Sequence, residues 1–163
     1  MGVSGSGKTT TGSQLAQRLR WDFYDADDFH PAENIHKMSA GIPLNDEDRV
    51  PWLEALNRML VECTNNGRPG VLSCSALKEK YRQALLKGTQ GVQLVYLKGD
   101  YNLLNKRLEA RQGHYMKAAL LKSQLDILEE PQNALVMDIA LPLEEILTQI
   151  AAHIQKTDPP GEQ

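Results

Sequence analysis

The residues best suited to chemistry stand at the start of the chain, where positions 2–9 read Gly-Val-Ser-Gly-Ser-Gly-Lys-Thr. This stretch fits the phosphate-loop pattern G-x-x-x-x-G-K-[ST] at every fixed position. Backbone N–H groups of such a loop, with the N-terminus of the following helix, cradle phosphates. The predicted nucleotide-binding residues are Gly2, Val3, Ser4, Gly5, Ser6, Gly7, Lys8, Thr9 and Thr10. Among them Lys8 would bridge the β- and γ-phosphates, and the Thr9 hydroxyl would hold Mg²⁺.

A second group of candidate residues is acidic. Asp25, Asp27 and Asp28 follow the short aromatic segment 21–24, which we expect to be a strand. Carboxylates at a strand end hold Mg²⁺ through water and accept a proton from a substrate hydroxyl. A solvated acidic turn or helix cap is the alternative, and the neighbouring phosphate loop favours the functional interpretation.

Cationic side chains form a third group, comprising His30, Lys37, Arg49, Lys78 and Arg82. A lone surface Arg or Lys is usually only solvated. These residues fall in segments that should border one edge of a sheet, so the argument rests on their grouping.

A further basic group surrounds Gly113, which we interpret as a hinge. Arg107, Arg111 and His114 flank this glycine. A mobile lid that carries arginine would close over the phosphates and exclude water. From the spacing alone, an ordinary helix with a basic last turn fits equally well, because the helix dipole favours cations there.

The elements that must position these groups alternate along the chain. Helical patterns cover 8–20, 31–40, 46–63, 78–87, 101–112, 120–128 and 143–155, and strand-like segments cover 21–24, 71–74, 92–97 and 135–137. Apolar strands separated by helices predict an α/β domain with a parallel sheet. Such folds bind ligands at the carboxyl ends of the strands, where the acidic and cationic groups would lie.

Size and composition narrow the class of protein. The chain has 163 residues, a net charge of −3 and no long basic run, which argues against a nucleic-acid partner. We expect one domain over 1–156 and a polar, disordered tail over 157–163. Cys63 and Cys74 form no disulfide framework, and no run approaches the ~20 apolar residues of a membrane span. We therefore expect a cytoplasmic protein with no membrane partner.

Three further stretches give the chain a family resemblance. They are D-A-D-D-F-H-P at 25–31, L-N-D-x-D-R-x-P-W-L at 44–53 and C-S-A-L-K at 74–78. With the phosphate loop, they resemble the small P-loop gluconokinases from residue 1 to about residue 155. The phosphate loop alone fits many kinases, so the specificity of the resemblance lies in these three stretches.

The resemblance implies a fold and a reaction. Its members share the three-layer P-loop NTPase fold, with a five-stranded parallel sheet, flanking helices and a helical lid, here about 111–130. They use ATP and Mg²⁺ to phosphorylate the 6-hydroxyl of D-gluconate, and they are usually homodimers. Gluconate carries one carboxylate and several hydroxyls, so a cation or two with hydrogen-bonding groups suits it.

The resemblance also implies roles for individual residues. Asp25 would sit with Thr9 near Mg²⁺, while Asp27 would orient the attacking hydroxyl. Gluconate would meet Asp27, His30, Arg49, Ser75, Lys78 and Arg82. Adenine would lie between Arg107 and Pro142, and the transferring phosphoryl would be approached by Lys8 and by Arg111 or His114.

The chain departs from the family at its start. Members have an apolar strand just before the phosphate loop, central in the sheet, and here only Met1 precedes it. Its loss would leave unpaired backbone groups and a slot through the core. Translation beginning a few residues upstream is one explanation, which we favour because the other motifs are intact; a destabilised or inactive chain is the other.

Two rival functions follow. Another small-metabolite kinase of the same fold, such as one for shikimate, is the nearer rival. The stretch 74–78 argues against it, because shikimate kinases have a Gly-rich turn at this place, and C-S-A-L-K does not resemble one. A non-catalytic nucleotide-binding protein is the second, and it would bind ATP without turnover.

Overall fold

The computed structural model describes residues 1–110 and 117–157. Its α-helices are α1 (Lys8–Leu19), α2 (Ala32–Ser39), α3 (Asp46–Asn65), α4 (Glu79–Leu86), α5 (Tyr101–Glu109), α6 (Lys117–Asp126) and α7 (Leu143–Thr157). A 3₁₀ helix, η1 (Ala26–Phe29), follows the first strand, and the strands are β1 (Asp22–Asp25), β2 (Gly70–Ser73), β3 (Val95–Lys98) and β4 (Leu135–Asp138). The predicted α/β class with parallel strands is confirmed.

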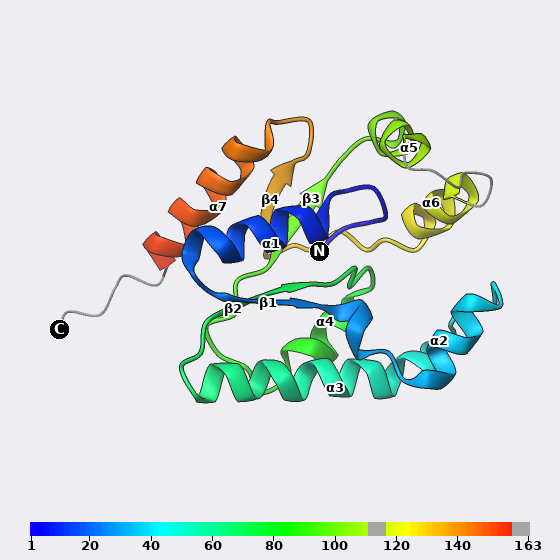
Figure 1. Cartoon of the computed structure of the whole chain (residues 1–163), viewed down its shortest axis with the longest axis horizontal. Helices are drawn as coiled ribbons and strands as arrows, with labels where there is room; N and C mark the ends of the chain where they lie inside the picture. Colours follow the sequence, from blue (N-terminus) through cyan, green and yellow to red (C-terminus); the bar gives the residue numbers. More distant parts are fainter. Residues whose placement is uncertain (111–116, 158–163) are drawn as a thin grey trace.

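The strands form two separate pairs within the described residues (Figure 1). β1 lies parallel to β2 with Asp22 opposite Gly70, and β3 lies parallel to β4 with Val95 opposite Leu135. Residues 1–110 and 117–157 thus form two strand pairs and not the single five-stranded sheet that the resemblance implies.

Each strand pair has its own hydrophobic core. The core beside β3 and β4 is built from α1, α5, α6 and α7 and includes the buried residues Leu104, Leu121, Ile139 and Ile150. The core beside β1 and β2 lies against α3 and α4, where Trp52, Leu56, Tyr81 and Leu85 are buried. Helix α1 packs against β1, β2 and α7, so it joins the two halves.

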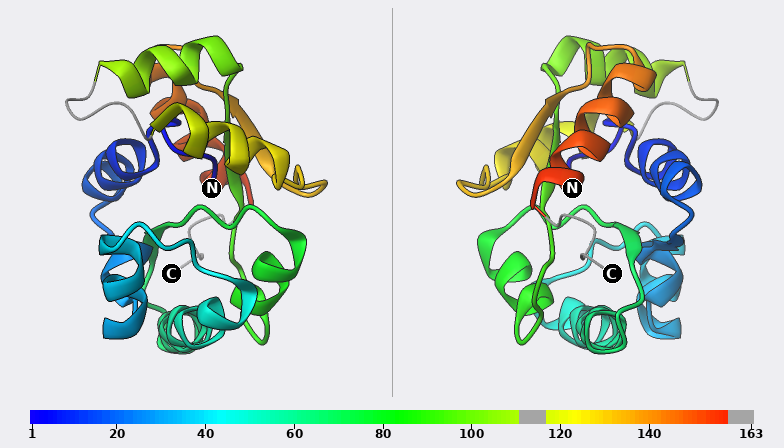
Figure 2. Two further views of the ribbon diagram at one scale, coloured as in Figure 1. Left: turned by 90° about the vertical axis from the view of Figure 1, so that its right-hand side faces the viewer. Right: turned by 90° about the vertical axis from the view of Figure 1, so that its left-hand side faces the viewer.

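Met1 and Gly2 lie between the two halves, as both views of Figure 2 show for the N-terminus. The Leu97 N–H donates to the Met1 carbonyl at 2.9 Å, and the Met1 amine donates to the Val95 carbonyl. On the other side, the Gly2 N–H donates to the Ser75 carbonyl at 3.3 Å. Met1 and Gly2 therefore form hydrogen bonds to segments of both halves.

One strand is shorter than the sequence pattern predicts, because part of the predicted segment has no neighbouring strand. The strand predicted over 92–97 begins only at Val95, because β4 pairs with it from that residue onward.

Helix α3 begins at a reciprocal capping box, in which the Asn45 side chain accepts the Asp48 N–H and the Asp48 side chain accepts the Asn45 N–H. In the described part of the chain, no helix has both the length and the apolar content needed to cross a membrane.

Candidate active site

The phosphate loop is shaped by close packing against α5. Gly5 has a φ of 83°, and a Cβ there would lie 3.1 Å from both the Leu104 carbonyl oxygen and the Leu108 side chain. Helix α1 then begins at a glycine N-cap, Gly7, with no side-chain cap and no acidic residue in its first turn. Its N-terminal N–H groups are thus presented to an anion, as the motif predicts.

Lys8 folds back over the loop that it follows. Its Nζ donates to the Val3 carbonyl at 3.1 Å. The ammonium therefore lies above the cradle of backbone N–H groups, where a β- or γ-phosphate would be placed. The neighbouring Ser6 side chain is buried, and its hydroxyl has no hydrogen-bond partner within the described residues.

Thr9 and Asp25 meet at the start of α1 and the end of β1. The Thr9 hydroxyl donates to the Asp25 carboxylate at 3.0 Å, and the other carboxylate oxygen accepts the Asp27 N–H at 3.2 Å. These are oxygen donors of the kind that Mg²⁺ prefers. Among the described residues, no three His, Cys, Asp or Glu side chains gather as metal ligands. The pair therefore fits a Mg²⁺ ion completed by phosphate oxygens and water.

A stacked His30–Trp52 pair borders the acidic turn. The two rings are parallel within 9° at 4.6 Å between centroids, and the Trp52 indole N–H donates to the Ala26 carbonyl at 2.7 Å. Burial lowers the pKa of His30, although Asp27 acts in the opposite direction. Within the described residues the buried His30 Nδ1 has no partner. A neutral imidazole here can hydrogen-bond a polyol hydroxyl.

Lys78, Lys80 and Tyr81 donate hydrogen bonds to Asp46, and Arg49 lies beside the Tyr81 ring; we call this group the Asp46 cluster. The Arg49 guanidinium lies 5.7 Å and the Lys78 ammonium 5.5 Å from the centre of the Tyr81 ring. The Asp46 carboxylate accepts hydrogen bonds from Lys80, from Tyr81 and from Lys78 at 3.2 Å, and these bonds hold its pKa well below the usual range. Sequence reasoning gave no role to Asp46 or Tyr81, because only the fold brings α3 and α4 together.

Arg82 is buried against the turn 74–78. Its side chain is only 3% exposed, and its guanidinium donates to the Ala76 and Leu77 carbonyls at 2.9 and 3.1 Å and to Glu79. These bonds hold the turn 74–78, in which Ala76 has a positive φ of 44°. Arg82 thus positions the segment that presents Ser75 and Lys78, and its own contact with substrate stays a prediction.

The predicted adenine residues lie near the loop after β4. The Arg107 guanidinium donates to the Ile139 carbonyl at 2.7 Å, and a Cβ on Gly7 would lie 3.9 Å from it. Pro142 accepts the Glu145 and Ile146 N–H groups at the start of α7. Thr10 is exposed in the first turn of α1. Arg111 and His114, and with them the start of the predicted lid, lie outside the described residues.

Gln124 on α6 contacts the phosphate loop directly. Its side-chain oxygen accepts the Ser4 N–H at 2.7 Å. Helix α6, part of the segment predicted as a lid, therefore reaches the phosphate-binding backbone. The sequence offered no physical signal for this role, since a polar residue on a helix face is usually solvated.

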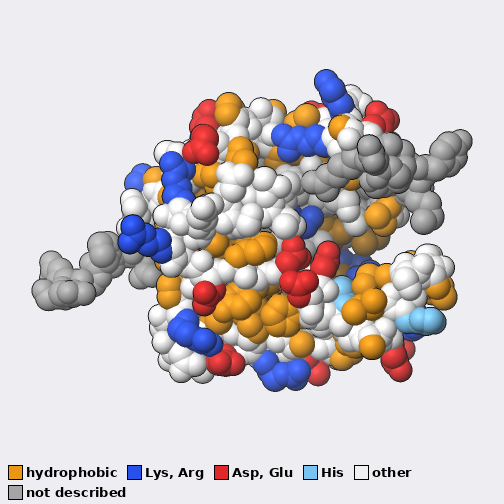
Figure 3. All heavy atoms as spheres, viewed as in Figure 1, with side chains coloured by type: hydrophobic (Ala, Val, Ile, Leu, Met, Phe, Trp, Pro, Cys, Tyr) orange, Lys and Arg blue, Asp and Glu red, His pale blue; other side chains and the backbone are white. Residues whose placement is uncertain are grey.

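The assembled groups surround a hollow in the surface. In the space-filling view, acidic, basic and histidine side chains meet on the side where α6 and α2 face each other (Figure 3). The phosphate loop, the Thr9–Asp25 pair and the Asp46 cluster thus come from different elements but share one edge of the fold. Such an edge, at the carboxyl ends of parallel strands, is where α/β proteins bind ligands.

Comparison with known proteins gives the family. The sequence model of the shikimate kinase family matches residues 4–156. Thermosensitive gluconokinase of Escherichia coli K12 is 52% identical over 132 residues, covering 81% of this chain and 71% of that protein. Thermoresistant gluconokinase of the same organism is 42% identical over 160 residues, covering 96% and 91%.

Solved structures agree with the sequence relatives. A crystal structure of a gluconokinase from Sinorhizobium meliloti 1021 matches with a TM-score of 0.85 and 42% identity, covering 96% of this chain and 89% of that one. Shikimate kinase from Aquifex aeolicus, at 17% identity and a TM-score of 0.59, shares the fold alone. Because its motifs, its phosphate loop and its relatives agree, the chain belongs to the shikimate kinase family of P-loop kinases, on its gluconokinase branch.

Proposed function

We propose that this chain transfers the γ-phosphoryl group of ATP to the 6-hydroxyl of D-gluconate, giving 6-phospho-D-gluconate. The observation that carries the proposal is the 3.0 Å contact between Thr9 and Asp25 beside the phosphate loop. It joins a nucleotide-binding motif to an acidic strand end, which is the arrangement that phosphoryl transfer needs. The relatives named gluconokinase support gluconate as the acceptor.

Different residues of the site would have different roles in phosphoryl transfer. The α1 N-terminus and Lys8 would bind and orient the phosphates, and such positioning is the main contribution of a protein to this reaction. Asp27, exposed on η1, would orient the attacking hydroxyl and accept its proton. Mg²⁺, held by Thr9 and Asp25 when bound, would neutralise charge on the β- and γ-phosphates.

The acceptor side of the site suits a sugar acid. Arg49 and Lys78 would meet the carboxylate, while Ser75 and the unpartnered Nδ1 of His30 would meet hydroxyls. A site that hydrogen-bonds several hydroxyls discriminates strongly against acceptors that lack them. The relatives named gluconokinase and the stretch 74–78 support gluconate over shikimate, although the two kinases share a family.

An ADP-release assay tests the proposal. The chain is given ATP and Mg²⁺ with gluconate, shikimate or a nucleoside monophosphate at equal concentrations. We expect turnover with gluconate and at most background rates with the others. Turnover with shikimate but not gluconate would refute the acceptor, and ATP binding without any turnover would support the non-catalytic alternative.

Three finer expectations accompany this function. A metal titration tests the proposed need for Mg²⁺: activity without a divalent ion would refute it. The proposed homodimer, which rests on the resemblance, is tested by sedimentation of the chain. A cytoplasmic location rests on its composition and its two unpaired cysteines, and is tested by cell fractionation.

A further inference from the structure

One segment of the chain, 124–129, contacts both substrate sides of the proposed site, and we call it the strap. It includes the end of α6 and the residues that follow. At one end Gln124 accepts the Ser4 N–H of the phosphate loop at 2.7 Å. At the other end Glu129 forms hydrogen bonds where the turn 74–78, which we call the acceptor turn, leads into α4. The strap therefore joins the side that would hold ATP to the side that would hold gluconate.

The bond from Gln124 fixes one peptide group of the phosphate loop. The Ser4 N–H belongs to the same planar unit as the Val3 carbonyl, so the two groups point in opposite directions. The Val3 carbonyl accepts the Lys8 ammonium at 3.1 Å and the Ser6 N–H at 3.2 Å. If this peptide plane turned, the carbonyl that orients the ammonium would turn with it. Gln124 therefore acts on Lys8 through the peptide between them.

The bonds from Glu129 fix the start of α4 in a similar way. Lys78 is the N-cap residue of this helix, but its side chain forms no cap. The Glu129 carboxylate provides the cap from outside by accepting the Glu79 N–H at 2.6 Å. The Glu129 N–H donates to the Leu77 carbonyl at 2.9 Å, and Arg82 donates to the same carbonyl at 3.1 Å. Lys78 thus stands between two residues that Glu129 holds in place.

The strap is also anchored in the core beside β3 and β4. Leu121 on α6 is fully buried in this core, and Leu125 and Leu128 pack against it. Val3 of the phosphate loop and Leu77 of the acceptor turn are buried in the same core. Since protein interiors are close-packed, the strap, the loop and the turn have fixed relative positions.

We propose that Gln124 and Glu129 are positioning residues that act as one unit and hold the phosphate loop and the acceptor turn at the spacing that phosphoryl transfer needs. Gln124 acts through a peptide on Lys8, and Glu129 acts through the ends of the acceptor turn on Lys78. Misplacement of reacting groups by about 1 Å can slow a reaction about 100-fold. The kinetic part of this inference rests on the proposed function, whereas the structural part does not.

Hydrogen exchange of the ligand-free chain tests the structural part. Gln124→Met keeps the length of the side chain and removes its amide oxygen. We expect the amides of Ser4 and Glu79 both to exchange about tenfold faster in this variant, and both to do so again in Glu129→Met. Lys122→Met, on the exposed face of α6, is the control and should change neither amide. Faster exchange only at the amide that lost its own partner, or an equal change in the control, would overturn the proposal.

Gluconate-dependent ADP release tests the kinetic part. We expect kcat to fall about tenfold in Gln124→Met, about tenfold in Glu129→Met and by a similar factor in the double variant, because the spacing is lost once either end is released. Glu129→Gln keeps an oxygen that can accept the Glu79 N–H, so it should recover most of the lost rate. A fall of about 100-fold in the double variant would show two independent bonds and overturn the proposal.

A purely structural role predicts a different result. It would lower the midpoint of thermal unfolding and leave kcat at low temperature unchanged, and this outcome would also overturn the proposal. If the parent chain does not turn over gluconate, the proposed function fails. The exchange of the Ser4 and Glu79 amides then decides by itself whether the strap acts as one unit.

Discussion

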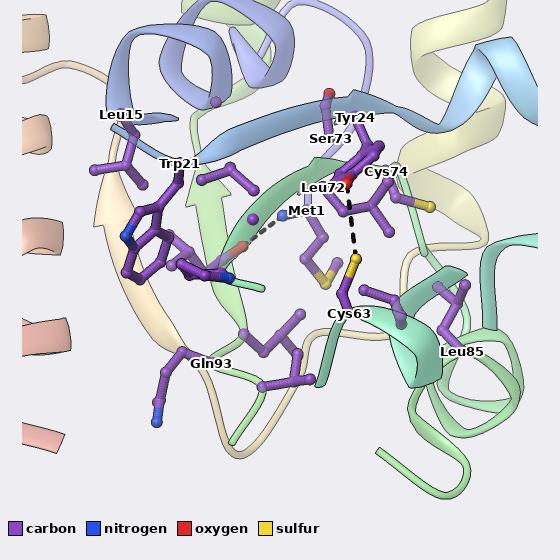
Figure 4. Close-up of a pocket in the computed structure, with 18 of the residues that line it drawn as sticks. Met1, Leu15, Trp21, Tyr24, Cys63, Leu72, Ser73, Cys74, Leu85 and Gln93 are labelled. Atoms are coloured by element: carbon purple, nitrogen blue, oxygen red, sulfur yellow. Dashed lines mark hydrogen bonds between the residues drawn. The ribbon is translucent and has the colours of Figure 1, made fainter. Parts of the chain in front are cut away.

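The phosphate-binding edge and the cavity of about 550 Å³ behind it, which we call the slot (Figure 4), differ in the contacts that hold them. The edge is held by contacts that reach it from several sides: Leu104 and Leu108 pack on Gly5, Gln124 bonds Ser4, and Asp25 bonds Thr9. The slot has apolar walls and two strand edges but only Met1 between them. The phosphate loop therefore takes its shape from lateral contacts, whereas the two strand pairs behind it are joined through α1, Met1 and Gly2.

The largest expected effect lies at the edge. Asp25→Asn removes the carboxylate charge beside Thr9 while keeping the size of the side chain, so we expect gluconate-dependent ADP release to fall about 100-fold or more. Asp28→Asn, three residues along in the same acidic turn, is the matched control and should stay near the parent rate. Equal losses in the two variants would show that only the general charge of the turn matters.

The second effect compares the free energy of unfolding lost by truncating a side chain in a filled core with that lost by truncating one in the wall of the slot. Leu56 is fully buried against Trp52 and its neighbours, so Leu56→Ala should lower the free energy of unfolding by about 3 kcal/mol. Leu72 lines a space that is already open, so Leu72→Ala should cost only about 1 kcal/mol. Urea titrations of both variants measure this difference. Equal losses would mean that the slot is closed in solution.

A third effect concerns pH and the buried amine of Met1. Its pKa is 8.0 when unfolded and about 5 when folded, with Cys74, Lys8 and Arg82 as its charged or titratable neighbours. Between these values the unfolded chain binds the proton and the folded chain does not. Stability is therefore fully present above pH 8 and falls toward pH 5, by at most about 1.4 kcal/mol per pH unit.

Acetylation of the amine is the control for this pH effect. An acetylated N-terminus cannot titrate, so its unfolding free energy should change less between pH 8 and pH 5 than that of the free chain. Identical pH profiles, measured by urea unfolding, would show that the amine is exposed to solvent.

The smallest expected effect concerns gluconate binding at the Asp46 cluster. Lys78→Gln removes one cation from the Asp46 cluster, and we expect the KM for gluconate to rise about tenfold while the KM for ATP stays nearly constant. Lys87→Gln, at the C-terminus of α4, is the control. An equal rise in both KM values would place Lys78 outside the acceptor site.

The sequence predicted the parts of the site that arise from short motifs. The phosphate loop and the Thr9–Asp25 pair follow from local patterns and from the meeting of strand ends at one edge of a parallel fold. The burial of Arg82 could not be predicted, because it depends on carbonyls turned inward by the bend at Ala76. Asp46 and Gln124 were missed for a related reason, since their partners come from distant helices.

The separation of the strands into two pairs was predictable in outline from the resemblance, whose members place a strand just before the phosphate loop, where this sequence has Met1. The sequence did not show that Met1 would pair with Val95 and Leu97, nor that each strand pair would keep a core of its own. Those features depend on packing across the whole domain.

The most direct test of the account is ADP release by the chain with ATP and Mg²⁺, measured with gluconate and with shikimate at the same concentration. We expect turnover with gluconate and at most a background rate with shikimate, because the phosphate loop, the Thr9–Asp25 pair and the Asp46 cluster are assembled in the folded chain. Absence of gluconate turnover in a folded, ATP-binding chain, or turnover with shikimate in its place, would contradict the account.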